Sequence, residues 1–337
     1  MLRFGITGTG RISDWVLKGA AQDPRIKVTA VCSRTEAAAE AFVRRNPLAE
    51  GARIYTSVEE MAADPEVDAV YIGTPNQTHC GYTLTALKAG KHVLCEKPLA
   101  LNAAEGRMMA EAAEKSGCLL MEAMISTLDP NFRAAAEHIS EIAPVRHYSS
   151  YFCQYSSKYD ALKRGEIGTA FKPGTAGALR DVGVYTLYPL VALFGRPSRI
   201  RGDLQTFTTA EGMTDVQGTA YLGYEGMDAV LVWSKTYDSF QPTEIAGENG
   251  NIILDEIHIA RKTEIIPHAA PTSGQGPKPG RMLISEGLPF NEYYYEFKEF
   301  ADLIEKGLKE SSSNSLQTSI TVLEIMDEIL TSSCRTR

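Results

Sequence analysis

Two glycines near the start of the chain restrict its fold more than any other feature of the sequence. The first residues alternate apolar and polar side chains as a strand does, Gly8 and Gly10 follow, and a helical pattern of apolar residues begins directly after them. A strand, a glycine-rich turn and a helix N-terminus in this order are the setting that a dinucleotide-binding fingerprint requires. Many glycine-rich turns bind nothing, so this motif alone leaves dinucleotide binding and an empty turn equally open.

Each small residue of this turn has a physical task. Gly8 can form the tight turn, and Gly10 lets the backbone approach a pyrophosphate, whose charge is attracted by the amides that open the helix. Ser13 occupies the third small position, where it need only allow helix and strand to pack closely. The cofactor contacts predicted for this turn are made by Gly8, Thr9, Gly10, Arg11 and Ile12.

Composition and charge narrow the class of protein. With 337 residues, 44% of them apolar and 23% charged, the chain is long enough for about two domains of an ordinary globular protein. A formal net charge of -8 argues against nucleic-acid and anionic-membrane partners. The six cysteines form no CxxC pair, so we expect free thiols in a reducing compartment and no metal site. No signal peptide and no apolar run of membrane-spanning length are recognised, which favours a cytoplasmic protein.

Strand-like and helical patterns alternate through the first third of the chain. The predicted strands cover residues 28–32, 54–55, 69–72, 92–95 and 119–121, and the predicted helices include 35–45, 78–89 and 103–116. Continuous apolar strands separated by helices indicate an α/β fold, a doubly wound parallel sheet with ligands at the carboxyl ends of its strands. We assign residues 1–124 to this cofactor-binding Rossmann domain.

The pattern changes in residues 125–337, which we predict to be an α+β domain for substrate binding and oligomerisation. After a helix at 131–141 and a strand at 145–154, alternating runs indicate strands at 200–208, 214–224, 227–237, 243–247 and 251–259. They predict an open, mainly antiparallel sheet with hairpin turns. Further helices are predicted at 292–308 and 315–330, the last a candidate to pack back on the first domain, and loops at 155–174 and 268–280. The loop at 155–174 suits either a substrate-pocket wall or an ordinary surface loop.

Ser33, Arg34 and Thr35 follow the second strand, where a NAD site needs an acidic residue for the ribose 2′-hydroxyl. Hydroxyl groups and a guanidinium instead suit a 2′-phosphate through charge-assisted hydrogen bonds. Ser33 and Arg34 therefore favour NADP over NAD. Arg34 also argues against S-adenosylmethionine, whose sites commonly place an acid here. The alternative is that Arg34 is a solvated residue in the first turn of a helix.

Three motifs occur together in the first domain. They are Gly8-x-Gly10, Thr74-Pro75-Asn76-x-x-His79 and the run from Ala89 to Pro98, which reads AGKHVLCEKP. With these motifs the chain resembles the glucose–fructose oxidoreductase, inositol dehydrogenase and MocA family (Gfo/Idh/MocA) over the whole first domain. Met121-Glu122-Ala123 and Pro130 make it similar to the dimeric dihydrodiol dehydrogenase branch.

The resemblance implies roles for residues at the strand ends. Glu96 would bind the nicotinamide ribose, Lys97 would be a catalytic residue beside the nicotinamide, and the Lys97–Pro98 peptide is often cis in the family. Physical reasoning agrees, since a lysine held at a strand end by a rigid proline can polarise a substrate hydroxyl or lower a neighbour's pKa. Outside this context Lys97-Pro98 would be a surface turn, and His79 could simply pack on its loop. The other cofactor contacts that the resemblance implies are Thr74, Pro75, Asn76 and His79.

A second constellation consists of Asp181, Gly183 and Tyr185. Asp181 and Tyr185 are four residues apart and would share one face of a helix, and Gly183 would allow a cofactor or substrate to approach. The resemblance implies that this is the tyrosine version of the family's Asp-x-Gly-x-His/Tyr motif. Tyr185 would then be the acid/base, with Lys97 making its phenolate accessible, and Asp181 would hold the substrate or orient the pair. A buried core tyrosine is the alternative.

These expectations combine into an NADP(H)-dependent oxidoreductase that moves a hydride between nicotinamide and a hydroxyl or carbonyl carbon. By resemblance the substrate, held between the two domains, is a sugar, a sugar derivative or a cyclic diol, and the C-terminal sheet forms a homodimer or homotetramer. A non-catalytic NADP-binding sensor of the same fold is the alternative, although such a protein need not keep both Lys97 and Tyr185. An S-adenosylmethionine-dependent transferase is disfavoured by Arg34 and by Glu96-Lys97-Pro98.

Overall fold

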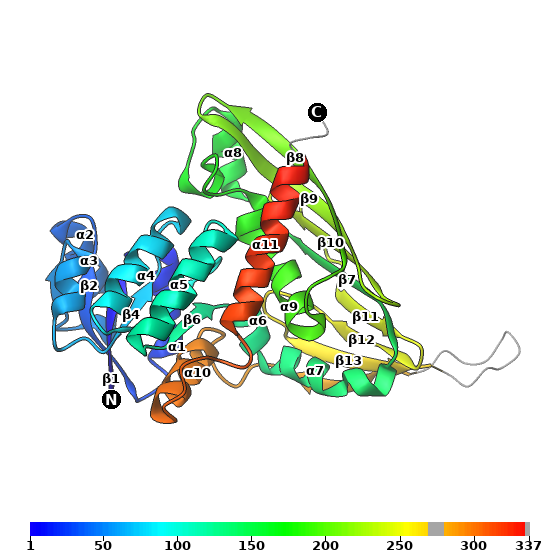
Figure 1. The fold of residues 1–337 in the computed structure, drawn as a ribbon, viewed down its shortest axis with the longest axis horizontal. Helices are drawn as coiled ribbons and strands as arrows, with labels where there is room; N and C mark the ends of the chain where they lie inside the picture. The colour runs from blue at the N-terminus through cyan, green and yellow to red at the C-terminus, as the bar shows by residue number, and fades with distance from the viewer. Residues whose placement is uncertain (269–279, 334–337) are drawn as a thin grey trace, which may run out of the picture. The chain divides into compact units, whose positions relative to one another are not determined.

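Two compact units make up the chain in the computed structural model, which describes residues 1–268 and 280–333 (Figure 1). One unit comprises Met1–Ile125 and Pro289–Leu323, and the other comprises Ser126–Leu288 with the segment that begins at Glu324. Residues 269–279, within the loop predicted at 268–280, lie outside the described residues. In the part of the chain that the structure describes, no helix is long and apolar enough to cross a membrane.

Six parallel strands form the sheet of the first unit, in the order β3-β2-β1-β4-β5-β6. They are β1 (Leu2–Thr7), β2 (Ile26–Cys32), β3 (Arg53–Tyr55), β4 (Ala69–Ile72), β5 (His92–Glu96) and β6 (Leu120–Ala123). The main helices between them are α1 (Arg11–Ala20), α2 (Glu36–Arg45), α3 (Val58–Ala63), α4 (His79–Lys88) and α5 (Ala103–Ser116). The predicted doubly wound parallel sheet is confirmed, and every residue of β4 is buried, as its continuous apolar run requires.

Helices of this unit begin where a side chain can satisfy a free backbone N–H. Oγ1 of Thr35 accepts from Ala38 before α2, and Oδ1 of Asn102 accepts from Glu105 at 2.9 Å before α5. At the other end of α5, Gly117 takes the left-handed conformation with φ 66°. Local sequence therefore determines these boundaries.

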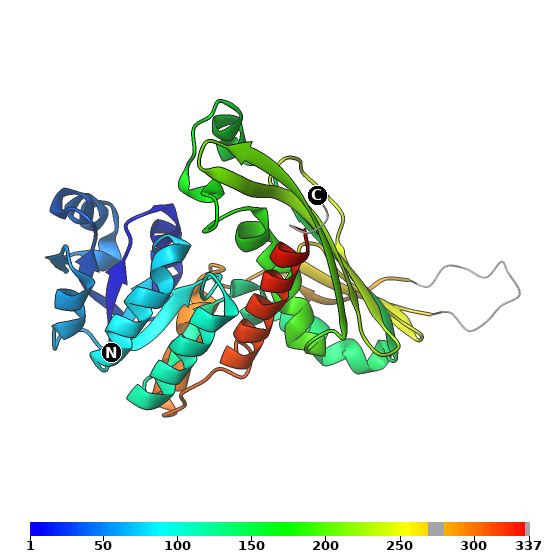
Figure 2. The ribbon, with the colours of Figure 1, turned by 45° about the horizontal axis from the view of Figure 1, so that its top comes forward.

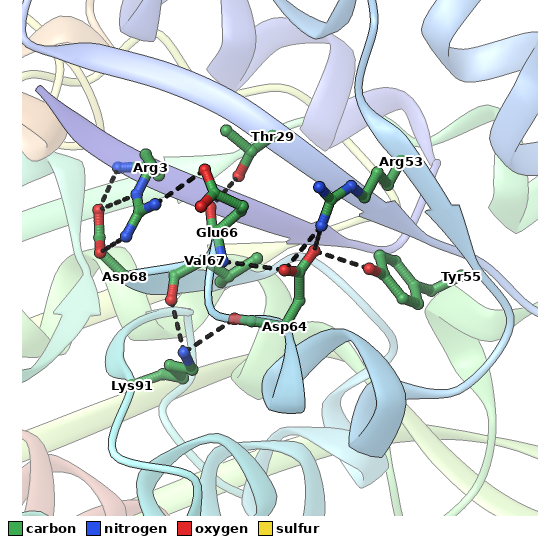
Figure 3. A network of polar contacts seen from close by, with 9 residues as sticks. All are labelled: Arg3, Thr29, Arg53, Tyr55, Asp64, Glu66, Val67, Asp68 and Lys91. Atoms are coloured by element: carbon green, nitrogen blue, oxygen red, sulfur yellow. Dashed lines mark hydrogen bonds and ion pairs between the residues drawn. The ribbon is translucent and has the colours of Figure 1, made fainter.

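Ion pairs and hydrogen bonds connect charged residues near the amino ends of the strands at one edge of this sheet (Figure 3). Arg3 in β1 holds Asp68, just before β4, with hydrogen bonds of 2.9 Å from Nε and 2.7 Å from Nη2. The carboxylate of Asp64 accepts from Arg53 of β3 at 2.9 Å, and its backbone carbonyl accepts from Lys91, before β5, also at 2.9 Å. Because the strands are parallel, all of their amino ends lie at one edge of the sheet, where these contacts are made. The carboxyl ends lie at the opposite edge, which is lined by other residues.

A helix from the C-terminal part of the chain completes the first unit. This helix, α10 (Tyr294–Glu305), places Phe297 and Phe300 against Phe4 of β1, with ring centroids 5.2 Å and 5.6 Å apart. The last helix, α11 (Leu316–Ser333), contributes Leu323 to the apolar core of the same unit, and its later residues belong to the second unit. The core of the first unit is therefore built from both ends of the chain.

An eight-stranded sheet dominates the second unit, in the order β14-β13-β12-β11-β7-β10-β9-β8. Among the described strands β7 and β10 pair in parallel and the other neighbours are antiparallel, so the predicted mainly antiparallel sheet is confirmed. The strands are β7 (Val145–Cys153), β8 (Arg199–Thr209), β9 (Gly212–Gly223), β10 (Asp228–Ser234), β11 (Thr243–Gly247), β12 (Gly250–Leu254), β13 (Lys262–Pro267) and β14 (Met282–Glu286).

Two strands and a short helix are among the elements of this unit that were not predicted. β13 and β14 form the edge of the sheet, and no residue of β14 is buried, so its side chains lack the alternation that marks a half-buried strand. A short helix, α8 (Ser157–Lys163), lies within the predicted loop at 155–174. Oγ of Ser156 accepts from the N–H of Lys158 and caps this helix, a signal that was present in the sequence.

Helices cover one face of the second sheet (Figures 1 and 2). α7 (Pro130–Ile142) and α9 (Val184–Phe194) lie against it on the same side. On β10, Leu231 and Trp233 are buried under that side, whereas the intervening Val230 and Val232 are only half-buried. The alternation therefore separates a core face from a second face of the sheet.

Candidate active site

The glycine-rich turn has the tight backbone geometry that the sequence predicts. Gly8 has a φ of +86°, and a Cβ atom there would lie 2.4 Å from the carbonyl oxygen of Gly73, so a larger residue would be strained. Gly10 precedes α1 and has open space beside it, since no atom lies within 4 Å of where its Cβ would be. Arg11 and Ile12 form the first turn of that helix. The turn thus presents backbone amides at a helix N-terminus, an arrangement that suits a pyrophosphate.

Ser33 and Arg34 lie at the end of β2, beside this turn. Oγ of Ser33 is 3.0 Å from Oγ1 of Thr9, and the Arg34 side chain is exposed. Sequence reasoning missed Arg45, whose guanidinium donates to the carbonyl of Thr9 at 2.8 Å and to Asp14 at 2.9 Å. A second cationic group therefore contacts the turn directly, and its signal was a basic residue in the last turn of α2.

The loop after β4 contains Thr74, Pro75 and Asn76, and His79 follows at the start of α4. His79 is fully buried, and its two ring nitrogens each lie 2.9 Å from a backbone carbonyl oxygen, that of Pro98 and that of Thr74. Burial lowers the pKa of His79, and the two carbonyl acceptors oppose that shift. His79 therefore ties the loop after β4 to the loop after β5.

Glu96 ends β5 and Lys97 follows it, joined to Pro98 by a cis peptide bond as the resemblance implies. The hydroxyl of Tyr71 donates to Oε1 of Glu96 at 2.7 Å, and the backbone N–H of Lys97 donates to Oε2 at 3.2 Å. Burial raises the pKa of the Glu96 carboxyl, and the charge of Lys97 opposes that rise. A lysine thus lies beside a buried acid at the carboxyl edge of the parallel sheet.

Two further buried carboxyls interact electrostatically with this pair. Glu122 of β6 accepts from the N–H of Leu99 at 2.9 Å, and burial raises its pKa to about 7. Glu296 of α10 is 1% exposed, and burial together with the charge of Glu96 raises its pKa well above the usual value. Sequence reasoning missed Glu296, because no local pattern relates α10 to a strand end so far away along the chain.

In the second unit, Asp181 and Tyr185 lie at the junction of two kinds of helix. Asp181 belongs to a π-helical segment, η4 (Leu179–Gly183), and Tyr185 to the first turn of α9, so the two residues lie on one helical stretch whose first part is irregular. Single π-helical turns are frequent at functional sites. Gly183 was expected to admit a cofactor or substrate, but a Cβ there would lie 3.0 Å from the ring of Trp233. That glycine makes room for core packing instead.

Aromatic rings surround Tyr185. The ring of Phe152, from β7, meets it edge-on at 5.3 Å, and the ring of His258 is 6.1 Å away. Phe152 and His258 stack on each other with centroids 4.5 Å apart. Neither residue was singled out in the sequence, since each lies in an ordinary strand or loop pattern. Together they restrict the orientation of the tyrosine ring.

Lys235 is a further residue that sequence reasoning missed. It follows β10 directly, is buried, and forms an ion pair with the Asp181 carboxylate. Its ammonium also lies over the ring of Phe171, 4.6 Å from the centroid. Within residues 1–268 and 280–333 no group of three or more His, Cys, Asp or Glu side chains is arranged to hold a metal ion.

Family models match both parts of the chain. A model described as an oxidoreductase family with an NAD-binding Rossmann fold, GFO_IDH_MocA, matches residues 2–124. A model of the GFO/IDH/MocA C-terminal domain matches residues 132–253. The matches agree with the resemblance that the motifs of the first domain carry.

Characterised relatives match over almost the full length of the chain. It is 39% identical over 330 residues to the scyllo-inositol 2-dehydrogenase (NADP(+)) IolU of Bacillus subtilis (strain 168), which covers 97% of this chain and 96% of that protein. It is 30% identical to the trans-1,2-dihydrobenzene-1,2-diol dehydrogenase of Danio rerio, with 97% and 95% covered.

Solved structures share the fold. A levoglucosan dehydrogenase in complex with NADH and levoglucosan matches with a TM-score of 0.85 and 20% identity, covering 99% of this chain and 97% of that one. KijD10, a 3-ketoreductase from Actinomadura kijaniata in complex with NADP, matches with a TM-score of 0.79 and 21% identity, covering 98% and 97%. At these identities the likeness concerns the fold alone.

Proposed function

Because this chain belongs to the Gfo/Idh/MocA family of oxidoreductases, we propose that it transfers a hydride between NADP(H) and a hydroxyl or carbonyl carbon of a sugar, a sugar derivative or a cyclic diol. The observation that carries the proposal is Lys97, which follows a buried acid at the carboxyl edge of the parallel sheet, where a doubly wound fold binds its ligand. Two relatives are named for scyllo-inositol and a dihydrobenzenediol, both rings with neighbouring hydroxyl groups.

The cofactor is NADP(H) in preference to NAD(H). Supporting this, the end of β2 offers the hydroxyl of Ser33 and the exposed guanidinium of Arg34 where a NAD site would need a carboxylate. The tight turn at Gly8 and the open space beside Gly10 suit the pyrophosphate. The further cofactor contacts that we assign are Thr74, Pro75, Asn76, His79, Glu96 and Lys97. The relative from Bacillus subtilis carries NADP(+) in its name.

Tyr185 and Lys97 are assigned the proton transfer. When bound, the nicotinamide supplies or accepts the hydride, which no protein side chain provides. Tyr185 exchanges a proton with the substrate hydroxyl, and the positive charge of Lys97 favours the phenolate form that does so. Asp181 holds the substrate, and Phe152 with His258 keeps the Tyr185 ring in one orientation.

The test is a fluorescence titration with NADPH and NADH, followed by aldoses, inositols and dicarbonyls, and by trans-dihydrodiols with NADP+. We expect NADPH to bind more tightly than NADH and one class of the panel to be turned over. Arg34→Asp should weaken NADPH binding by about tenfold or more and NADH binding little, because a carboxylate repels a 2′-phosphate. Equal small effects on both cofactors would contradict the assignment of Arg34.

Lys97→Met should abolish turnover in the same assay and leave NADPH binding largely intact, because the variant keeps the length of the side chain and removes its charge. Lys88→Met is the matched control, since Lys88 is an exposed lysine in the last turn of α4 and should behave as wild type. Persistent activity of the Lys97 variant would make that residue structural. Tight NADPH binding by a wild-type protein that turns over nothing would favour a sensor instead.

Association of copies through the second sheet belongs to the same proposal. Its support is the half-buried, partly apolar face of β10 and its neighbours, opposite the face that α7 and α9 cover. Open sheets that expose such a face are commonly paired with a second copy.

A further inference from the structure

The buried ammonium group of Lys235 forms an ion pair with Asp181, one of the assigned site residues. The side chain of Lys235 is 4% exposed, whereas the side chain of Asp181, its ion-pair partner, is 42% exposed. The backbone of Lys235 is held by a 3.0 Å hydrogen bond from its N–H to the carbonyl of Val216. A molecule arriving from solvent therefore meets the carboxylate first, with the ammonium underneath it.

The surroundings of Lys235 keep water away from its charge. Phe171, 1% exposed, covers the ammonium with its ring face at 4.6 Å, and the apolar residues Leu162 and Val216 pack around that phenyl ring. A charge in such surroundings is costly unless it is paired, and a cation–π contact offsets only part of that cost. Of the two acids that interact with this ammonium, Asp181 forms the ion pair, and Asp215 interacts with its charge electrostatically.

The position of Asp181 explains what this pairing does. Asp181 sits in the π-helical segment η4, and its backbone N–H donates to the carbonyl of Gly177 at 3.1 Å. A second acid is close by, but Asp215 is buried and its Oδ2 accepts from the N–H of Leu179 at 2.6 Å, so its orientation is set by the backbone. The side chain of Asp181, by contrast, is contacted by the ammonium of Lys235.

We propose that Lys235 is a positioning residue for the reaction, which holds the Asp181 carboxylate in the one orientation that binds a substrate hydroxyl. The proposal rests on the function proposed above, in which Asp181 contacts the substrate. The side chain of Asp181 is 42% exposed, so a hydroxyl donor can reach its carboxylate while the ion pair with Lys235 is kept.

A double-mutant cycle tests this role. Asp181→Asn, Lys235→Met and the double variant are compared in kcat, KM, NADPH affinity and thermal unfolding. We expect each single change to lower kcat/KM by about tenfold or more. The kcat/KM of the double variant should be less than about threefold below that of Asp181→Asn, because Lys235 acts through Asp181. NADPH affinity should stay within about threefold of wild type, since the assigned cofactor contacts lie on other elements.

Two results would overturn the proposal. The first is a Lys235→Met variant with wild-type kcat/KM beside an impaired Asp181→Asn variant. The second is a double variant whose loss equals the product of the single losses, since that would mean that Lys235 acts independently, for example on Asp215. Asp181→Asn leaves the buried ammonium of Lys235 without its carboxylate partner. If that variant fails to fold, the double variant, which lacks both charges, is compared with Lys235→Met, and a further loss of about tenfold or more in the double variant would overturn the proposal.

Controls separate this proposal from the proposed function. Lys115→Met removes an exposed lysine that pairs with Glu111 at 3.7 Å, and it should leave kcat/KM unchanged. If the wild type turns over no panel member, the proposed function fails, and binding of scyllo-inositol to the NADPH complex, measured by thermal shift, becomes the readout. If this thermal shift is lost in both single variants, the role of Lys235 is supported. If the shift persists in Lys235→Met, or if the wild type shows none, the role of Lys235 is overturned.

Discussion

Glu122 shows how one buried side chain can make the parallel sheet sensitive to pH. Its carboxyl is 2% exposed, burial raises its pKa to about 7, and hydrogen bonds from Ser319 and from the N–H of Leu99 oppose that rise. An unfolded chain would release this proton near its ordinary pKa of 4.5. The folded protein therefore binds the proton more tightly than the unfolded chain does.

The free energy of unfolding should consequently fall as pH rises from about 4.5 to about 7 and stay lower above that range, with Glu122 contributing up to about 3 kcal/mol of the change. Glu122→Gln keeps an acceptor for the Leu99 N–H and carries no charge at any pH. We expect its melting temperature to drop less than that of wild type between pH 5 and pH 8. Glu111→Gln, at an exposed position, is the control and should keep the wild-type slope. Identical slopes for all three proteins would exclude Glu122 as a source of the pH dependence.

At the scale of elements, α10 packs closely against the backbone of α1, in addition to its aromatic contacts with β1. A Cβ atom on Gly19 of α1 would lie 2.5 Å from the carbonyl carbon of Tyr293, at the start of α10. Arg25 adds a polar link, donating to Asp302 of α10 at 2.7 Å. The close approach of α1 and α10 thus depends on the absence of a side chain at one position.

Gly19→Ala should destabilise the protein by about 1–3 kcal/mol, since the added methyl group has rigid backbone in its way. Gly81→Ala is the matched control, because nothing lies within 4 Å of the would-be Cβ on Gly81 in α4. There the change should stabilise by about 0.5–1 kcal/mol through helix propensity. Denaturant unfolding of both variants measures the difference. A Gly19 variant as stable as the Gly81 variant would mean that α10 can move away without loss.

For the whole molecule, the proposed association of copies makes the face of the second sheet opposite α7 and α9 the candidate interface. Val232 of β10 lies beside Tyr151 of β7, and Val230 lies beside Tyr221 of β9, so apolar side chains run across neighbouring strands on that face. Tyr221 is 39% exposed. A contiguous, partly apolar surface of this kind is typical of an interface.

Val232→Lys should shift the protein to a smaller species in analytical ultracentrifugation, because it places a charge in the middle of the proposed interface. Val43→Lys makes the same change at a half-buried position on α2 and should leave the sedimentation coefficient of the wild type unchanged. A wild-type protein that sediments as a monomer would refute the association. An unchanged oligomer in Val232→Lys would place the interface elsewhere.

Patterns of short range made much of this protein predictable. The alternation of apolar strands and capped helices indicated the parallel sheet, and the glycine turn indicated the strained position at Gly8. The motif around Lys97 indicated a residue at the end of β5, with the cis peptide to Pro98. In these cases the controlling interactions join residues close together in sequence, such as backbone strain, capping and side-chain periodicity.

Only tertiary structure decided which distant side chains meet. Glu296 reaches the buried acids of the first sheet from α10, and Lys235 reaches Asp181 from the end of β10. Gly183, read from the sequence as room for a ligand, instead makes room for Trp233. Burial and charge pairing depend on which surfaces pack together. Single residues far apart along the chain show no periodic pattern that would predict this packing. The sequence by itself therefore determined the parallel sheet and the ends of its strands, whereas packing decided the electrostatic surroundings of the residues placed there.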